Sequence, residues 1–589
     1  MIVLSFNGFS NAATCHDIYF GMNGIDRNRV IGHDAAAALF IDGKLIAAAE
    51  EERFSRVKKT SAFPENAIEF CLKQANVTLH DIDIIAFPWD ISEDIFTDML
   101  TGVLSQSISL AKKLEVSDKL KSLYYHLFSH DCIIQDFNCH MKTDFTADQF
   151  SFVPHHFAHA LTGFLVSGMH KSAILVTDGR GETSSAIMGE ISKKSFNVLD
   201  ESIISISNSI GLLYRKFTRY LGFMPNNDEY KVMALGTFAK SPSVYDVDKF
   251  MELLPHGQIK LKIPGYTGSG DDIYYYRFFD DYFGSKSEKR DYAMAYFVQH
   301  MAEMAISHQI NYLQEKTDAD ILLMEGGVAL NCVNNSKILV NSRFKNVYVS
   351  FSASDSGTVI GAGLYPFYQQ KIFDKTPITP YLGPSFEEDE ILTALNSKAE
   401  QIEFSRLDWN DLCDEVTAHL INKKIIGWFQ DRMEFGPRAL GNRSILANPA
   451  FPDMKDIINA KVKYREAFRP FAGVILDTEA DNYFEMGKKK NTPFMTFVFK
   501  AKPEAYDKLP GAVHVDNTSR LQTVIAKQNP KLHGLIANFF KKTGLPCLIN
   551  TSFNVQGEPV VCKPLDAINC FLNSGIDILV VENYLVTKK

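Results

Sequence analysis

Apolar and polar positions in the first 370 residues alternate in a pattern that predicts strands followed by helices. The apolar run IVLSFN (residues 2–7) predicts a buried strand, and ENAIEFCLKQA (residues 65–75) has the spacing of an amphipathic helix. Two apolar segments flank Asp42-Gly43, a strong signal for a hairpin. Residues 91–145 are helical in pattern but charged and irregular, which predicts an insertion. The fold class that this pattern predicts is α/β.

Three further apolar strands each end abruptly at glycine or aspartate. They are SAILVTDGRGE (172–182), ADILLMEGGVALN (319–331) and NVYVSFSASDSGTVIGAG (346–363). Open α/β sheets build ligand crevices at the carboxyl ends of their strands, so we expect a binding site where these loops meet.

The periodicity is lost in KIFDKTPITPYLGPS (residues 371–385), which contains three prolines. We therefore predict a first domain over 1–372, a linker over 373–385 and a second α/β domain over 386–589. The sequence contains no internal repeat.

Composition limits the classes of function. Of the 589 residues 46% are hydrophobic and 22% are charged, which is typical of a globular protein, and the net charge is −9. An acidic chain is poorly suited to binding nucleic-acid phosphates, so we expect no nucleic-acid partner.

No apolar run approaches the roughly 18 residues that cross a bilayer, and the start of the chain lacks a signal-peptide pattern. The nine cysteines include no CxxC pair, which favours reduced thiols and a cytoplasmic location. The sequence leaves open whether the protein forms a homodimer.

Two glycine-rich turns at strand ends are candidates for phosphate binding. Gly179 and Gly181 form one, and Gly326 and Gly327 the other. Glycine lets backbone N–H groups approach a phosphate closely, although a single such turn is more often only a turn. The P-loop string is absent, and turns from separate hairpins suit the actin-like ATPase arrangement.

The string PHHFAHA (residues 154–160) places His155 and His159 four residues apart, on one face of a helix. Such a pair can bind one metal ion if carboxylates complete the site, and Asp178 and Asp355 lie at strand ends. For this spacing alone the commoner alternative is a solvent-facing first turn.

The second half concentrates cations among glycines and aromatic residues. DRMEFGPRALGNRSILANP contains Arg438, NAKVKYREAFRPFAG contains Lys463, and NTSRLQTV contains Arg520. Arginine binds phosphate or carboxylate with two parallel hydrogen bonds. NTSFNVQGEP adds Ser552 and Asn554. Together these segments predict an anion pocket; the alternative for the basic run is a solvated helix face.

These strings, together with GHDAAAALFIDGKLIAAAEEERFSR, NDEYKVMALG and GGVALNC, occur in family order along nearly the whole chain. In this the sequence resembles the NodU/CmcH family of O-carbamoyltransferases. The resemblance implies an actin-like ATPase-type domain, like that of the threonylcarbamoyladenosine-synthesis protein, followed by a YrdC-like domain. It implies that the second domain makes carbamoyl adenylate from carbamoyl phosphate and ATP. The first domain then transfers the carbamoyl group to a hydroxyl of a small-molecule acceptor, a natural product or a sugar.

The resemblance also implies roles for single residues. It gives His155, His159, Asp178 and Asp355 as ligands of an iron-type divalent metal (Fe2+), with Mg2+ accompanying ATP. The carbamoyl phosphate site would comprise Arg438, Lys463, Arg520, Ser552 and Asn554. The ATP or adenylate site would comprise Gly179, Gly181, Lys231, Gly326, Gly327 and Asn331. Catalytic roles fall to His33, Asp34, Arg438 and Lys463.

This chain departs from the family pattern at two positions near the first hairpin. Ala36 stands where many relatives have serine, and Lys59 stands where many have histidine, which leaves the acceptor-side base undecided. Two alternatives from other classes remain: a tRNA-modifying carbamoyladenylate enzyme and an actin-like small-molecule kinase.

Overall fold

The computed structural model describes residues 1–20, 32–105, 109–239, 245–263, 272–466 and 468–589. Two compact units are present. Unit 1 comprises residues 1–55 and 59–378, and unit 2 comprises residues 56–58 and 379–589. Both are built of sheets and helices, so the predicted α/β class is confirmed.

The first sheet of unit 1 has the strand order β3-β2-β1-β4-β5. Strands β1, β2 and β3 form an antiparallel meander, whereas β4 runs parallel to β1 and β5 parallel to β4. The predicted hairpin at Asp42-Gly43 is confirmed, because it joins β2 to β3. The strand bounds are β1 Ile2–Asn7, β2 Ala36–Ile41, β3 Lys44–Glu50, β4 Ile84–Phe87 and β5 Phe150–Phe152.

The second sheet of unit 1 repeats this topology. An antiparallel meander of β6, β7 and β8 is followed by β12, parallel to β6, and by β13, parallel to β12. The sequence showed no internal repeat, yet the two halves have one strand order and one set of strand directions. The bounds are β6 Lys171–Thr177, β7 Ser184–Ser192, β8 Phe196–Val198, β12 Ile321–Glu325 and β13 Asn346–Val349.

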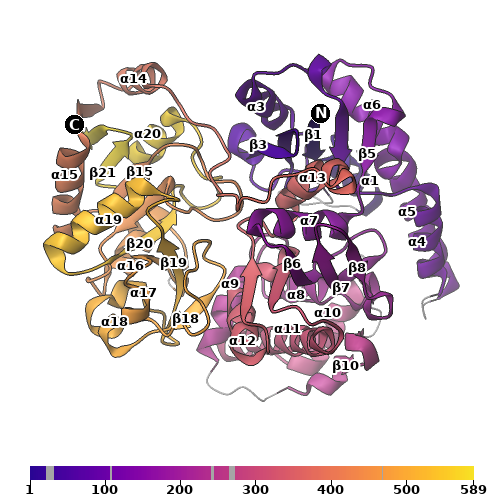
Figure 1. Cartoon of the computed structure of the whole chain (residues 1–589). Helices are drawn as coiled ribbons and strands as arrows, with labels where there is room; N and C mark the ends of the chain where they lie inside the picture. The colour runs from indigo at the N-terminus through magenta and orange to yellow at the C-terminus, as the bar shows by residue number, and fades with distance from the viewer. Residues whose placement is uncertain (21–31, 106–108, 240–244, 264–271, 467) are drawn as a thin grey trace. The chain divides into compact units, whose positions relative to one another are not determined.

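Each half ends in a helix that follows its last strand. Helix α7 (His155–Ser167) follows β5 and packs on the second sheet, and α13 (Thr358–Gln370) follows β13 and packs on the first. The two helices also pack against each other, as Figure 1 shows. A Cβ at Gly361 of α13 would lie 1.8 Å from the carbonyl oxygen of Ala158, so glycine is required for this close approach.

The predicted helical insertion is confirmed in its secondary structure. Helices α4 (Glu93–Ser105), α5 (Leu110–Leu123) and α6 (His130–Met141) connect β4 to β5. Between β8 and β12 lie α8 (Ile210–Tyr220), α9 (Glu229–Leu235), α10 (Asp272–Phe283) and the long α11 (Glu288–Lys316), and α12 (Cys332–Asn341) connects β12 to β13.

Unit 2 contains a mixed sheet of nine strands in the order β14-β22-β21-β15-β16-β20-β17-β19-β18. One face packs apolar side chains against α15 (Trp409–Ile421) and α19 (Pro530–Thr543). The other packs against α14 (Glu388–Asn396), α16 (Met454–Ile458) and α20 (Pro564–Leu572). The central strands are β15 Ile426–Phe429, β16 Arg443–Ala447, β20 Cys547–Ser552, β17 Ala472–Leu476 and β19 Thr518–Val524. The outer strands are β14 Ile402–Arg406, β22 Tyr584–Lys588, β21 Ile578–Val581 and β18 Val498–Lys500.

Within the described ranges, every helix is too short or too polar to cross a membrane.

Candidate metal centre and anion site

Four side chains of metal-ligand type meet in unit 1, and they are the four candidates predicted from the sequence. The candidate ligand atoms of His155, His159, Asp178 and Asp355 all lie within 4.8 Å of one another. Both histidines are on the first two turns of α7, Asp178 follows β6, and Asp355 precedes α13. The helix–helix contact at Gly361 therefore brings residues about 200 positions apart into one cluster. The alternative of a solvent-facing helix turn is wrong, since both histidines are fully buried.

The distances within this cluster are those of side chains that surround a common point. His155 Nε2 lies 3.5 Å from Asp178 Oδ2 and 4.0 Å from Asp355 Oδ1, and His159 Nε2 lies 3.7 Å from Asp355 Oδ1. Among the described residues, His155 Nε2 and both ring nitrogens of His159 have no hydrogen-bond partner. Buried polar atoms are nearly always paired, so this set is a candidate site for a cation.

Surrounding groups orient two of the candidate ligands, His155 and Asp178, toward the cluster. His155 Nδ1 lies 3.2 Å from the carbonyl oxygen of Pro88, which can only accept, so in the neutral imidazole the proton is on Nδ1 and Nε2 carries the lone pair. The Trp89 ring stacks on the His155 ring at 3.9 Å. The Gly327 N–H donates to Asp178 Oδ1 at 2.8 Å, which leaves Oδ2 facing His155.

Without a bound cation, the surroundings of His155 and Asp178 favour the charged forms of these two side chains. Burial lowers the pKa of His155, but the neighbouring Asp178 and Asp355 carboxylates outweigh it, and the pKa lies above its ordinary value. The pKa of Asp178 lies far below its ordinary value, since the nearby histidines overcome the effect of burial. His156 behaves differently: burial and the neighbouring His155 lower its pKa to about 3, and its Nδ1 lies 3.0 Å from Ser184 Oγ. His156 therefore lies outside the cluster.

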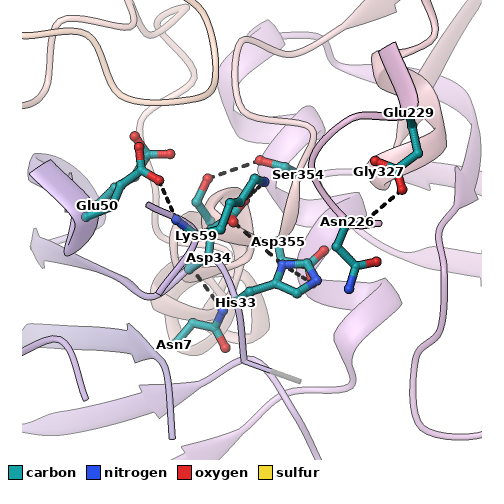
Figure 2. A network of polar contacts seen from close by, with 12 residues as sticks. Asn7, His33, Asp34, Glu50, Lys59, Asn226, Glu229, Gly327, Ser354 and Asp355 are labelled. Carbon is teal, nitrogen blue, oxygen red and sulfur yellow. Dashed lines mark hydrogen bonds and ion pairs between the residues drawn. The ribbon is translucent and has the colours of Figure 1, made fainter. Parts of the chain in front are cut away.

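A second polar network touches the cluster at Asp355. His33 Nδ1 lies 3.9 Å from Asp355 Oδ2 and 3.6 Å from Asp34 Oδ1, and Lys59 Nζ binds Asp34 Oδ2 at 2.7 Å. Figure 2 shows this group together, with Asn7 beside Asp34. Burial raises the pKa of Asp34, but Lys59 and His33 lower it more strongly, so the carboxylate stays ionised. His33 and Asp34 are candidates from the sequence, and the structure brings both next to the cluster.

The other candidates in unit 1 all have protein partners. Lys231 Nζ pairs with Asp228 at 3.0 Å, and the Asn331 amide exchanges two hydrogen bonds with the Gln299 amide. The Gly181 N–H closes a turn onto the Ser184 carbonyl, and Ser209 Oγ donates to the Gly179 carbonyl. Gly326 has φ +88°, where a Cβ would lie 2.4 Å from the Thr177 oxygen. The Gly326-Gly327 turn thus orients Asp178, a role that the glycine pattern alone did not suggest.

In unit 2, three of the predicted anion-site residues form one hydrogen-bonded group. The buried Lys463 Nζ donates to Asn554 Oδ1 at 2.8 Å, to the Asn554 carbonyl at 2.9 Å and to Ser552 Oγ at 3.3 Å. Burial, reinforced by nearby arginines, holds the pKa of Lys463 well below its ordinary value. Lys463 therefore fixes the turn after β20.

Strand register places Arg520 and Ser552 on the same face of the unit 2 sheet. Gly473 is opposite Leu521 on β19, and Ala472 is opposite Asn550 on β20, so Arg520, Ala472 and Asn550 form one row across three strands. Ser552 lies two residues beyond Asn550 and thus on the same face. Arg520, Asn550 and Ser552 form the polar end of this face, and α15 and α19 cover its other, apolar end.

Arg438 belongs to a loop that is anchored over this polar end. One oxygen of the buried Glu434 accepts from the backbone N–H groups of Leu440, Asn442 and Arg443. The neighbours of Arg438 on its C-terminal side, Ala439 and Leu440, accept hydrogen bonds through their carbonyls from the side chains of Asn550 and Gln522. Arg438, Arg520 and Ser552 are therefore assembled on one side of the sheet. Arg443 has a different place: it is fully buried, its guanidinium lies 3.6 Å from the Phe429 ring, and it donates to backbone carbonyls.

Two family models match this chain over most of its length. Residues 24–364 match the model described as carbamoyltransferase N-terminus, and residues 417–588 match the model described as carbamoyltransferase C-terminus. The chain belongs to the carbamoyltransferase family. The resemblance to the NodU/CmcH enzymes is thus confirmed, and the protein is a transferase.

Curated relatives agree with this assignment. The carbamoyltransferase is 34% identical to nodulation protein NolNO of Sinorhizobium fredii over 96% of this chain and 81% of that protein. It is 33% identical to an uncharacterized protein of Synechocystis over 94% of this chain and 95% of that protein.

Solved structures resemble the carbamoyltransferase only distantly. Component A of (R)-2-hydroxyglutaryl-CoA dehydratase from Acidaminococcus fermentans is 11% identical, with a TM-score of 0.31. The match covers 63% of this chain and 99% of that chain. HypF from T. kodakarensis is 9% identical, with a TM-score of 0.33 over 64% of this chain and 49% of that one. At these TM-scores the family assignment rests on the sequence matches.

Several residues around the two sites carry no sequence signal of their own. Pro88 and Trp89 follow an ordinary buried strand, and Glu434 is one of many acidic residues. Asn550 and Gln522 are polar residues within β20 and β19. Their roles depend on register and on loop closure, which no local pattern encodes.

Proposed function

We propose that this carbamoyltransferase is an ATP-dependent O-carbamoyltransferase that acts through carbamoyl adenylate. Unit 2 would form the adenylate from carbamoyl phosphate and ATP in a YrdC-like manner. Unit 1, working as an actin-like ATPase-type domain, would transfer the carbamoyl group to a hydroxyl of a small-molecule acceptor. The observation that carries this proposal is the cluster of four buried ligand-type residues beside His33 and Asp34.

The cluster is suited to a divalent cation. Two imidazoles and two carboxylates converge, and the nitrogens of His155 and His159 that face the cluster are unpaired within the described part of the chain. Several divalent metals accept this ligand set, iron among them, so the residues do not select Fe2+. When bound, the cation would stabilise negative charge on the departing AMP. Mg2+ would accompany ATP as its ordinary counter-ion.

The reaction in unit 2 would consume carbamoyl phosphate and ATP together. Water would cleave carbamoyl phosphate to carbamate and inorganic phosphate. A carbamate oxygen would then attack the α-phosphorus of ATP, so that a C–O–P linkage forms and pyrophosphate leaves. Arg438 and Arg520 would hold the anionic substrate, because guanidinium groups bind phosphate oxygens in a two-point geometry. Lys463 would hold Ser552 and Asn554 in place beside them.

The transfer in unit 1 would need a base at the acceptor. The acceptor oxygen would attack the carbamoyl carbon, the bond to the AMP oxygen would break, and the hydroxyl proton would pass to His33. Asp34, which is held ionised by Lys59, would stabilise the protonated imidazole. Lys59 would thus support the base from the position where many relatives have a histidine.

The test is the identity of the nucleotide product. With carbamoyl phosphate, ATP and a panel of hydroxylated acceptors, we expect AMP, pyrophosphate and an acceptor that gains the mass of one carbamoyl group, in equal amounts. Formation of ADP would contradict the proposal and favour an actin-like kinase. Loss of activity after nuclease treatment would favour a tRNA substrate instead.

A further inference from the structure

A buried asparagine in unit 2 lies on the same sheet face as the predicted anion-binding residues. Asn550 is in β20, in one row with Arg520 and two residues before Ser552. Its side chain is 1% exposed.

The orientation of the Asn550 amide is fixed by backbone carbonyls. The Leu440 carbonyl can only accept, so the atom of Gln522 that lies 2.8 Å from it is the amide nitrogen. The oxygen of Gln522 consequently faces Asn550 and accepts from its Nδ2 at 2.7 Å. The Ala439 carbonyl, 3.4 Å from the same Nδ2, agrees with this assignment. Two separate carbonyls therefore determine which atom of Asn550 is oxygen.

The remaining atom, Asn550 Oδ1, is a buried acceptor without a donor among the described residues. Ser444 Oγ, which is opposite Ser552 across the β16–β20 pair, is a second buried polar atom without a partner in the described ranges. Buried acceptors are nearly always satisfied, and an unpaired one costs stability. A ligand on this face would therefore present an N–H donor to Asn550 and an anionic group to the arginines.

We propose that Asn550 Oδ1 accepts a hydrogen bond from the –NH2 group of carbamoyl phosphate and thereby distinguishes it from acyl phosphates. This inference rests on the proposed function, because it assumes that carbamoyl phosphate binds in unit 2. Acetyl phosphate has the same size and charge but presents a methyl group in place of –NH2. Sites built to hydrogen-bond a substrate N–H reject an analogue that lacks it, since the buried acceptor then stays unpaired.

The test measures the binding of three probes to the full chain without ATP, by isothermal titration calorimetry at low temperature. The probes are carbamoyl phosphate, acetyl phosphate and inorganic phosphate. For the wild type we expect carbamoyl phosphate to bind about tenfold more tightly than acetyl phosphate, the equivalent of about 1.4 kcal/mol. In Asn550→Ala the two should bind within about twofold of each other. Asn550→Asp keeps an acceptor oxygen but adds negative charge. All three probes should therefore bind more weakly, while the preference for carbamoyl phosphate persists.

The matched control is Asn448→Ala. Asn448 is also a buried asparagine of unit 2, but its amide is satisfied by the Leu420 carbonyl and the Ala450 N–H. This variant should lose stability and keep the wild-type preference. Equal binding of carbamoyl and acetyl phosphate by the wild type would overturn the proposal, as would an unchanged preference in Asn550→Ala. Binding of none of the three probes would instead refute the anion site itself, and with it the proposed function of unit 2.

Discussion

Glu325 offers a quantitative test of the interior of unit 1. It is the last residue of β12, directly before the Gly326-Gly327 turn that orients Asp178, and it is 1% exposed. Its oxygens accept from the Ser350 N–H at 3.2 Å and from Ser350 Oγ at 3.1 Å, and no cation pairs with it among the described residues. Glu325→Gln keeps the shape and the acceptor oxygen and removes only the ionisation.

The magnitude follows from the pKa. Burial raises the pKa of Glu325 to about 8 from an ordinary 4.5, against the smaller opposing effect of Ser350. Between these two pH values the unfolded chain has released the proton while the folded protein keeps it. Stability therefore falls as the pH rises from about 5 to about 8, and the fall from this one group is at most about 5 kcal/mol at about 1.4 kcal/mol per pH unit.

The assay is thermal unfolding of the wild type and of Glu325→Gln at several pH values between 5 and 8. We expect the melting temperature of the wild type to fall across this range and that of the variant to fall much less, so that the variant is the more stable protein at pH 8. Exposed Glu403 in β14 provides the control, because Glu403→Gln should leave the wild-type slope unchanged. If Glu325→Gln retains the full wild-type slope, the carboxyl is not held neutral and the reasoning is refuted.

Two further predictions concern the metal cluster. His159→Ala should leave the fold intact and reduce the bound divalent metal, measured by elemental analysis, to a small fraction of the wild-type amount; full metal content would rule out the ligand assignment. Gly326→Ala should destabilise the protein by at least about 1–2 kcal/mol, since alanine is strained at positive φ and its Cβ would meet the Thr177 oxygen. The comparison is Gly102→Ala in α4, where the added Cβ meets nothing within 4 Å and denaturant unfolding should show equal or greater stability.

Local patterns predicted much of the fold because they depend on near neighbours in the chain. The hairpin at Asp42-Gly43, the helical insertion over 91–145 and the strands that deliver Asp178 and Asp355 were all readable from apolar spacing and turn residues. The duplicated topology of unit 1 was not, since strand order is set by pairing between segments far apart in sequence. The order of the nine strands in unit 2 could not be predicted for the same reason.

In the candidate site, too, local patterns predicted some residues, whereas others depend on contacts between distant segments. The His155 and His159 pair is visible because helical spacing puts both on one face, and Asp178 and Asp355 are visible as carboxylates at strand ends. The structure adds that all four lie together. What fixes the tautomer of His155 is a carbonyl at Pro88, which no side-chain pattern marks. Asn550 likewise became a candidate only through strand register and an unpaired oxygen atom.

The central claim is that carbamoyl adenylate is made by unit 2 and consumed by unit 1, and the most direct test uses Arg438→Ala with two donors. Loss of one charge-assisted contact costs about 1.5–3 kcal/mol, so carbamoyl transfer from carbamoyl phosphate and ATP should slow by about 10- to 150-fold. With preformed carbamoyl adenylate as the donor, the same variant should transfer the carbamoyl group at the wild-type rate. If Arg438→Ala is equally slow with the preformed adenylate, the division into two half-reactions is contradicted.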